Sequence, residues 1–378
     1  QNGQWLVADL FRPRSATADD PAPLVVVVPG FQRSKEALSN VAIELARRGI
    51  VAISIDPYAQ GGSSASMSRR AATTEGYGMF AVVEYAFDTP NLNYVDKSRI
   101  GATGHSAGGN AAIRGANYFG KEAQRTGQPS KLHSVFVSGY VLTLTEEVLR
   151  DVRSNVGMSY AFYDEGAYRN ELGDGDMRVA PESLRLVNIG RDRALTPVSE
   201  VELGNYYGDV GERTFRVVYN ERVLHPFQPY IVEATANQIE YFEHVFGLDS
   251  GLSSRDQVWF WKELFSLVSL VTAMVMLIPL ARALLRVPVF ASLVHPVPPP
   301  VPAPEGRGRG LFWSLFATGA LIACFTYIPM AELSQALFVD ASSRVQTWFF
   351  PQRMNNAVMM WAVLNGLVGF LMFWLSYR

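Results

Sequence analysis

The 378-residue chain has a formal net charge of -2, an isoelectric point near 6.3 and one cysteine. Without a basic field, a basic stripe or zinc-finger spacing, the composition excludes nucleic acid as an expected partner. The lone Cys324 excludes an internal disulfide and a thiolate metal cluster.

The length exceeds that of one compact domain, so we expect two unlike parts. The mean hydropathy of +0.07 hides an uneven distribution, because nearly all the long apolar runs lie near the end of the chain. We therefore predict a globular domain over residues 1–250 and a membrane region over residues 251–378.

The first buried element is predicted at residues 24–28, a run of leucine and valine that ends at a Pro-Gly turn. An uninterrupted β-branched run is typical of a strand buried on both faces. A helix is predicted over residues 35–48, between a Ser34 N-cap and a Gly49 stop, and a second buried strand follows at residues 50–56.

Alternation of strands and helices continues along the domain. The further predicted helices are residues 76–87, 106–119 and 232–246, and the further predicted strands are residues 100–103, 134–141, 184–189 and 214–219. This order predicts an α/β fold, with a mostly parallel sheet and helices on both faces. Residues 142–183 are too long for an ordinary connection, so we expect a lid there.

The membrane region contains three stretches of spanning length, at residues 264–285, 311–330 and 357–376. Proline-rich residues 287–310 separate the first two and are predicted to form a stiff linker, with a site for a proline-reading domain as the alternative. Arginines dominate the charge in and beside this linker: Arg282, Arg286, Arg307 and Arg309. By the positive-inside tendency the linker faces the cytoplasm, which places the globular domain on the extracytoplasmic side of a multi-pass membrane protein.

The strongest chemical motif is Gly104-His105-Ser106-Ala107-Gly108, at the junction of a predicted strand and a predicted helix. This is the context of a nucleophile elbow, in which a sharp turn exposes the serine. Cβ atoms at Gly104 and Gly108 are expected to collide with the neighbouring backbone. Ser106 is thus the candidate nucleophile.

A serine hydroxyl needs a base and an acid that orients the base. Among five histidines, His225 follows the last predicted strand and is the candidate base; the alternatives are His105, His133, His244 and His295. Asp192 follows the preceding predicted strand and is the candidate acid, with Asp174 and Asp176 as rivals. The order Ser106, Asp192, His225 is the order of this type of fold.

Together, Pro29-Gly30-Phe31, the elbow, Gly190-Arg191-Asp192 and His225 resemble the α/β-hydrolase superfamily over roughly residues 5–248. The chain is most similar to dienelactone-hydrolase-like and polyester-hydrolase or cutinase-like esterases. The resemblance implies a Ser-His-Asp triad and an oxyanion hole formed by the backbone N–H groups of Phe31 and Ala107. It also implies that the Phe31 ring borders the acyl group.

These features predict a membrane-anchored serine hydrolase that cleaves carboxylic esters of apolar or lipid-like acyl groups, without a metal or cofactor. Tyr58, Tyr160 and Phe162 join Phe31 as candidate substrate contacts. Peptidase and acyltransferase activity remain open, since both use the same triad. The expected partners are an acyl-ester small molecule or lipid and the membrane lipids. The alternative is an accessory subunit that contacts other membrane subunits and keeps the domain as a docking module.

Overall fold

The structure, a computed structural model, describes residues 3–189, 196–300, 302–343, 345, 347–350 and 352–377. The chain divides into two compact units. One comprises Gln1–Trp259 with Ser343–Pro351, and the other comprises Phe260–Ser342 with Gln352–Arg378. We refer to the first as the sheet unit and to the second as the helical unit.

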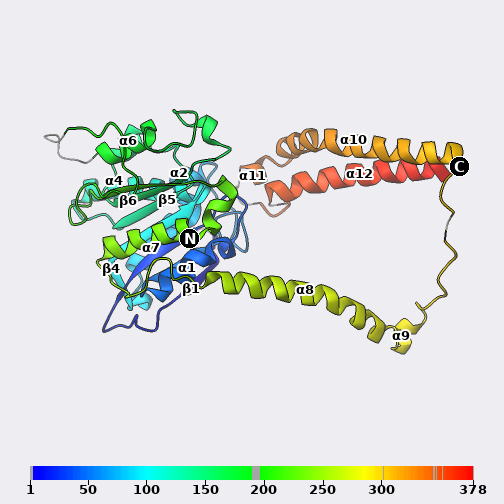
Figure 1. The fold of residues 1–378 in the computed structure, drawn as a ribbon, viewed down its shortest axis with the longest axis horizontal. Coiled ribbons are helices and arrows are strands. Elements are labelled where there is room, and N and C mark those ends of the chain that lie inside the picture. Colours follow the sequence, from blue (N-terminus) through cyan, green and yellow to red (C-terminus); the bar gives the residue numbers. More distant parts are fainter. Residues whose placement is uncertain are drawn as a thin grey trace. The chain divides into compact units, whose positions relative to one another are not determined.

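A seven-stranded sheet forms the centre of the described sheet unit, in the order β1-β3-β2-β4-β5-β6-β7 (Figure 1). The strands are β1 (Ala8–Phe11), β2 (Ala22–Val28), β3 (Val51–Ile55), β4 (Val95–His105), β5 (Ser134–Ser138), β6 (Asn155–Ala161) and β7 (Arg216–Glu221). Strand β1 is antiparallel to β3, and the other pairs are parallel. The predicted α/β class is confirmed.

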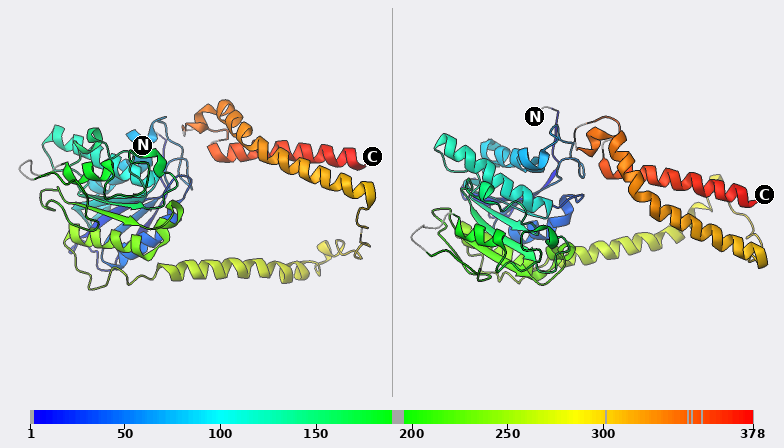
Figure 2. Two further views of the ribbon diagram at one scale, coloured as in Figure 1. Left: turned by 45° about the horizontal axis from the view of Figure 1, so that its top comes forward. Right: turned by 90° about the horizontal axis from the view of Figure 1, so that it is seen from above.

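Helices cover both faces of this sheet (Figure 1, Figure 2). The longer ones are α1 (Ser39–Arg47), α3 (Met79–Asp88), α4 (Ala107–Thr126), α6 (Pro181–Asn188) and α7 (Val232–Phe246). The short ones are α2 (Ala71–Thr74) and α5 (Glu146–Leu149), with 3-10 turns η1 (Lys35–Leu38), η2 (Gly76–Gly78), η3 (Pro90–Leu92), η4 (Ala167–Arg169) and η5 (His225–Tyr230).

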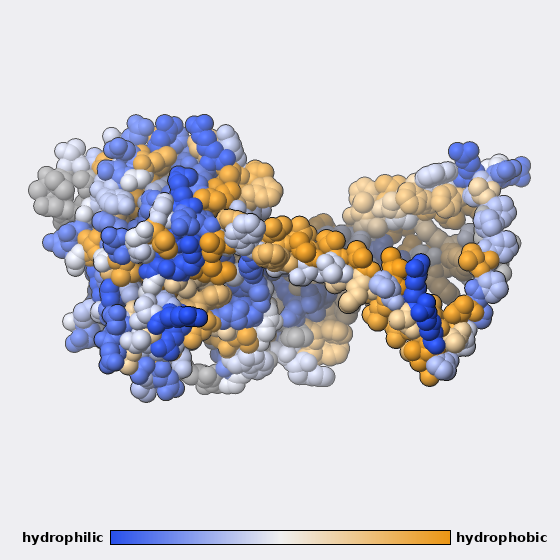
Figure 3. Space-filling model, turned by 60° about the horizontal axis from the view of Figure 1, so that its bottom comes forward, coloured by the Kyte–Doolittle hydropathy of each residue, from blue (hydrophilic) through white to orange (hydrophobic). Residues whose placement is uncertain are grey.

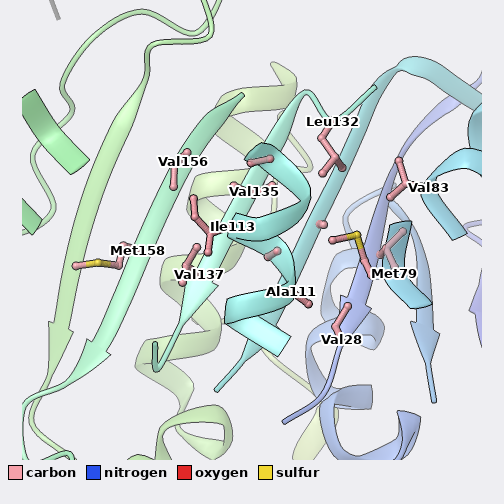
Figure 4. Packing of buried hydrophobic residues seen from close by; sticks show 14 of the residues in the cluster. Val28, Met79, Val83, Ala111, Ile113, Leu132, Val135, Val137, Val156 and Met158 are labelled. Atoms are coloured by element: carbon pink, nitrogen blue, oxygen red, sulfur yellow. The ribbon is translucent and has the colours of Figure 1, made fainter. Parts of the chain in front are cut away.

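The apolar run of β2 is explained by these two layers. Val26 and Val28 belong to the core cluster that also contains Met79 of α3 and Ile113 of α4 (Figure 4). Val25 and Val27 belong to the cluster with residues of α1 and α7 on the other face. Successive side chains of a strand point to opposite faces, so a strand covered on both sides is apolar throughout.

Two sequence predictions are wrong. Residues 184–189 were expected to form a strand, but Pro181–Asn188 is helix α6, with Pro181 in its first turn and Leu186 and Val187 buried. The expected lid at residues 142–183 contains β6, which is a buried strand of the sheet. Strand β6 was not predicted because it contains polar residues. Asn155 and Ser159 are nevertheless buried, and hydrogen bonds satisfy their side chains.

The helical unit contains three helices that are long and apolar enough to span a membrane: Trp259–Leu284, Gly306–Leu337 and Arg353–Ser376. They belong to α8 (Trp259–Leu284), α10 (Gly306–Leu337) and α12 (Arg353–Tyr377), with short α9 (Pro288–Ala291) and α11 (Val339–Ser342) beside them. Figure 3 shows apolar side chains over the surface of the long helices. Helix α12 packs against α10, and the Trp361 indole N–H donates to the Ala323 carbonyl at 2.9 Å.

Candidate active site

Ser106 occupies a strained turn between β4 and α4. Its backbone has φ 58° and ψ -117°, a conformation that residues with a Cβ atom rarely adopt. A Cβ atom at Gly104 would lie 2.4 Å from the Val28 oxygen, and one at Gly108 would lie 1.8 Å from the same atom. The predicted need for these glycines is therefore confirmed, and the turn has the geometry of a nucleophile elbow.

The Pro29-Gly30-Phe31 turn lies directly against the elbow. A Cβ atom at Gly30 would be 3.4 Å from the Ser106 Cβ atom and 3.3 Å from the His105 carbonyl oxygen. Ala107 is the first residue of α4, at the end of the helix where backbone N–H groups point outward. Both predicted oxyanion-hole residues thus follow strand ends beside Ser106.

His225 begins turn η5 after β7, and its ring lies 4.5 Å, centroid to centroid, from the ring of His105. Its Nδ1 atom is 2.7 Å from Oδ2 of Asp164. Since one ring nitrogen bonds the carboxylate, Nε2 is the nitrogen left to exchange a proton with a nucleophile.

Asp164 comes three residues after β6, and its side chain is 6% exposed. Its Oδ1 atom accepts the Gly166 backbone N–H at 2.7 Å. Burial acts to raise the pKa of Asp164, but the hydrogen bonds from His225 and Gly166, together with the nearby Tyr160 hydroxyl, outweigh it and hold this pKa below its ordinary value. The carboxylate beside His225 is therefore ionised at neutral pH.

The sequence analysis did not single out Asp164. Its candidate, Asp192, lies outside the described residues. Of the two rivals, Asp176 pairs with Arg178 at 2.5 Å, and Asp174 accepts the Asp176 backbone N–H at 2.8 Å. The signal that identifies Asp164 is its place just after a strand, and this signal was missed together with β6.

The other histidines have different surroundings. Burial, and then the charge of His225, lower the pKa of His105 to about 3, so this ring is neutral at any physiological pH. Burial also lowers the pKa of His133 to about 4, and its ring lies beside that of Phe246. His244 is on helix α7, and its ring lies against the ring of Tyr206. His295 is in the exposed linker.

The candidate substrate contacts differ in position. Phe31 is 44% exposed beside the elbow. Tyr160 is buried, and its hydroxyl helps to lower the pKa of Asp164. Phe162 is half-buried, with its ring 5.1 Å from that of Tyr163. Tyr58 is buried and lines a cavity with Trp5, and the triad residues are not among the described residues of its wall.

Exposed apolar side chains gather on the loops at the carboxyl edge of the sheet. They follow β2, β5, β6 and β7, and they are Phe31, Leu142, Tyr163, Leu224, Phe227 and Tyr230. Because the carboxyl ends of parallel strands meet at one edge, these side chains surround the same edge as Ser106. Among the residues that the structure describes, no group of three or more His, Cys, Asp or Glu side chains could hold a metal ion.

Residues 8–167 match a family model described as PET hydrolase-like. A comparison with curated proteins gives no match. Among solved structures, the chain is similar to Est1E from Butyrivibrio proteoclasticus with bound ferulic acid, at 14% identity and TM-score 0.44, covering 65% of this chain and 97% of that one. It is also similar to esterase 2 of Thermogutta terrifontis phosphorylated by paraoxon, at 17% identity and TM-score 0.42, covering 64% and 90%.

The described sheet, the elbow and the family match together define the class of the domain. The chain has a domain with the α/β-hydrolase type of sheet and elbow, of which residues 8–167 are similar to a PET hydrolase-like family model, and three apolar helices of membrane-spanning length follow it.

Proposed function

We propose that this protein is a membrane-anchored serine hydrolase that cleaves carboxylic esters. Ser106 is the nucleophile, His225 the general base and Asp164 the residue that orients it. The observation that carries the proposal is the 2.7 Å hydrogen bond between His225 and Asp164, with the His225 ring 4.5 Å from the ring of His105, the residue before the strained Ser106. Asp164 here takes the role that the sequence analysis gave to Asp192.

The reaction follows from these positions. Ser106 Oγ attacks the acyl carbon while its proton passes to Nε2 of His225, and the imidazolium that forms is stabilised by the Asp164 carboxylate. The oxyanion accepts hydrogen bonds from the N–H groups of Phe31 and Ala107. Collapse of the intermediate expels the alcohol, which takes the proton from His225. A water molecule then attacks the acyl-enzyme in the same way and releases the acid.

The substrate that fits this edge of the domain is an ester with an apolar acyl group, including a lipid-like one. Phe31, Leu224 and Phe227 expose apolar surface on loops that flank the triad, and apolar contact is the interaction that these side chains offer. The PET hydrolase-like match points toward the same ester chemistry.

A fluorophosphonate probe tests the proposal on the full chain in detergent micelles. We expect labelling of the folded protein, loss of labelling in Ser106→Ala, and hydrolysis of p-nitrophenyl butyrate by the unsubstituted protein. A folded protein that neither takes the label nor hydrolyses the ester would refute catalysis and favour the alternative, an accessory membrane subunit.

A further inference from the structure

The turn that carries Phe31 contains backbone strain. Gln32 has φ 60°, in the left-handed region that favours glycine. An ordinary residue is strained in this conformation, so surrounding contacts must hold it there. The Phe31 N–H shares one planar peptide unit with the Gly30 carbonyl, so contacts that hold this carbonyl and the strained Gln32 fix the direction of the Phe31 N–H.

Gln60 supplies these contacts from the loop after β3. Its Oε1 atom accepts the Gln32 backbone N–H at 2.9 Å. Its Nε2 atom donates to the Arg33 carbonyl at 2.6 Å and to the Gly30 carbonyl at 3.2 Å. One side-chain amide thus bonds the residues on both sides of Phe31, and Gln60 is only 8% exposed.

The loop that presents Gln60 is itself fixed. The Gln60 backbone N–H donates to the Pro57 carbonyl at 2.9 Å, and the Ala59 N–H donates to the Ser64 carbonyl at 2.8 Å. The Asp56 carboxylate connects the same two loops, since it accepts the Lys35 N–H at 2.7 Å and the Gly62 N–H at 2.8 Å. The side chain of Gln60 therefore extends to the turn from a loop that is itself held by hydrogen bonds.

We propose that Gln60 is a positioning residue of the oxyanion hole: it holds the strained turn so that the Phe31 N–H points at the oxygen that becomes negative on Ser106 attack. The proposal rests on the proposed function. Gln60 does not touch the reacting atoms; it acts through the backbone of Gly30, Gln32 and Arg33.

This role predicts a particular kinetic signature. The oxyanion forms in the transition state, so a misdirected donor lowers kcat and leaves KM nearly unchanged. Removing one oxyanion-hole donor outright costs about 100- to 1000-fold in kcat. Because Gln60→Ala loosens the donor without removing it, we expect a loss of kcat on the order of 10- to 100-fold.

The test measures kcat and KM for p-nitrophenyl butyrate with the full chain in detergent micelles, together with inhibition by an alkyl boronic acid, which forms a tetrahedral adduct with the serine. We expect Gln60→Ala to weaken the boronic acid by about the same factor as kcat, because both report transition-state binding. Gln60→Glu keeps an acceptor for Gln32 but loses both donors, and we expect a loss in the same direction.

Gln257→Ala is the matched control. Gln257 is also buried, and its side chain makes three similar bonds, to the Val232 and Ser254 carbonyls and from the Trp259 indole N–H. We expect it to lower stability without lowering kcat.

Three outcomes overturn the proposal: kcat within twofold of the unsubstituted protein in Gln60→Ala, an equal loss in Gln257→Ala, or failure of both Gln60 variants to fold. A failure of the proposed function looks different, because the unsubstituted protein itself would then show no esterase activity and no fluorophosphonate labelling.

Discussion

At the scale of single residues, the proposed reaction depends on the carboxylate beside His225. An imidazole that must accept the Ser106 proton needs its other nitrogen held in one tautomer. Asp164 meets this need, since its carboxylate bonds Nδ1 at 2.7 Å and is itself fixed by the Gly166 N–H.

Replacement of Asp164 tests this assignment. We expect Asp164→Asn to lower kcat for p-nitrophenyl butyrate by about 1000- to 10,000-fold, because an amide favours the wrong imidazole tautomer. Asp192→Asn is the matched control and should leave kcat within about threefold. The reverse result, with the large loss in Asp192→Asn, would return the role of acid to the residue that the sequence analysis chose.

The buried histidines make the domain sensitive to acid. His105 is neutral in the native state, with its pKa lowered to about 3, whereas the unfolded chain binds its proton near the ordinary pKa of about 6.5. Between these values the unfolded state binds more protons, so stability is complete above about pH 6.5 and falls as the pH falls. His133, with its pKa lowered to about 4, adds to the same trend.

We therefore expect the urea midpoint of the domain to fall between pH 7.5 and pH 5, with His105 alone contributing about 2 kcal/mol at pH 5. His133→Gln should reduce this dependence, because a glutamine does not take up a proton. His295→Gln, in the exposed linker, should leave it unchanged. A midpoint independent of pH over this range would contradict the expectation.

The sequence predicted Ser106 and His225 because their signals are local: glycines forced by a sharp turn, and a histidine just after a strand. It missed Asp164 because the preceding strand contains buried polar residues. The hydroxyl of Ser159 in β6 is buried because it donates hydrogen bonds to the Glu221 carboxylate, at 2.9 Å and 2.7 Å. Glu221 lies 62 residues further along the chain. A partner so distant in sequence cannot be recognised from a run of residue types.

At the scale of elements, the difference between local sequence signals and long-range contacts explains which parts of the fold could be predicted. Strand β2 was recognised because both its faces are covered by apolar residues. Helix α6 was mistaken for a strand because its apolar residues, Leu186 and Val187, are adjacent in a short segment that periodicity cannot resolve.

One side chain of α1 joins the domain to the start of α8. The Glu44 carboxylate is fully buried and lies 2.9 Å from Arg48, which is also buried, and 2.8 Å from Arg47. The same carboxylate accepts the backbone N–H groups of Val258 at 2.7 Å and Trp259 at 3.0 Å. These N–H groups have no acceptor within the helix, so Glu44 caps the first turn of α8.

Loss of the Glu44 charge should therefore destabilise the domain strongly. We expect Glu44→Gln to lower the free energy of unfolding by about 3–5 kcal/mol, because it leaves the Arg48 guanidinium buried without a counter-charge. Glu171→Gln is the control: Glu171 pairs with Arg185 at 2.5 Å but is 53% exposed, so its loss should cost at most about 1 kcal/mol. Equal urea midpoints for the two variants would show that the buried pair contributes no more than a surface pair.

At the scale of the whole molecule, the three long helices fix which parts of the chain share a side of the membrane. If α8, α10 and α12 each cross once, the linker between α8 and α10 lies opposite the domain, and the segment between α10 and α12 lies on the domain's side. By the positive-inside tendency, we expect the arginine-rich linker to face the cytoplasm and the domain to lie outside.

Cysteine labelling in intact cells tests this topology. In a Cys324→Ser background, we expect Thr126→Cys on the domain to react with a membrane-impermeant maleimide, and Val297→Cys in the linker to react only after the cells are permeabilised. Val297 is 92% exposed and Thr126 is also exposed, so access in the folded protein does not limit either reaction. The reverse pattern would place Ser106 in the cytoplasm, and labelling of both sites in intact cells would contradict an odd number of crossings between them. Both introduced cysteines lie within the given sequence, so the result does not depend on its N-terminal end. The result shows whether the proposed active site is exposed to esters inside or outside the cell.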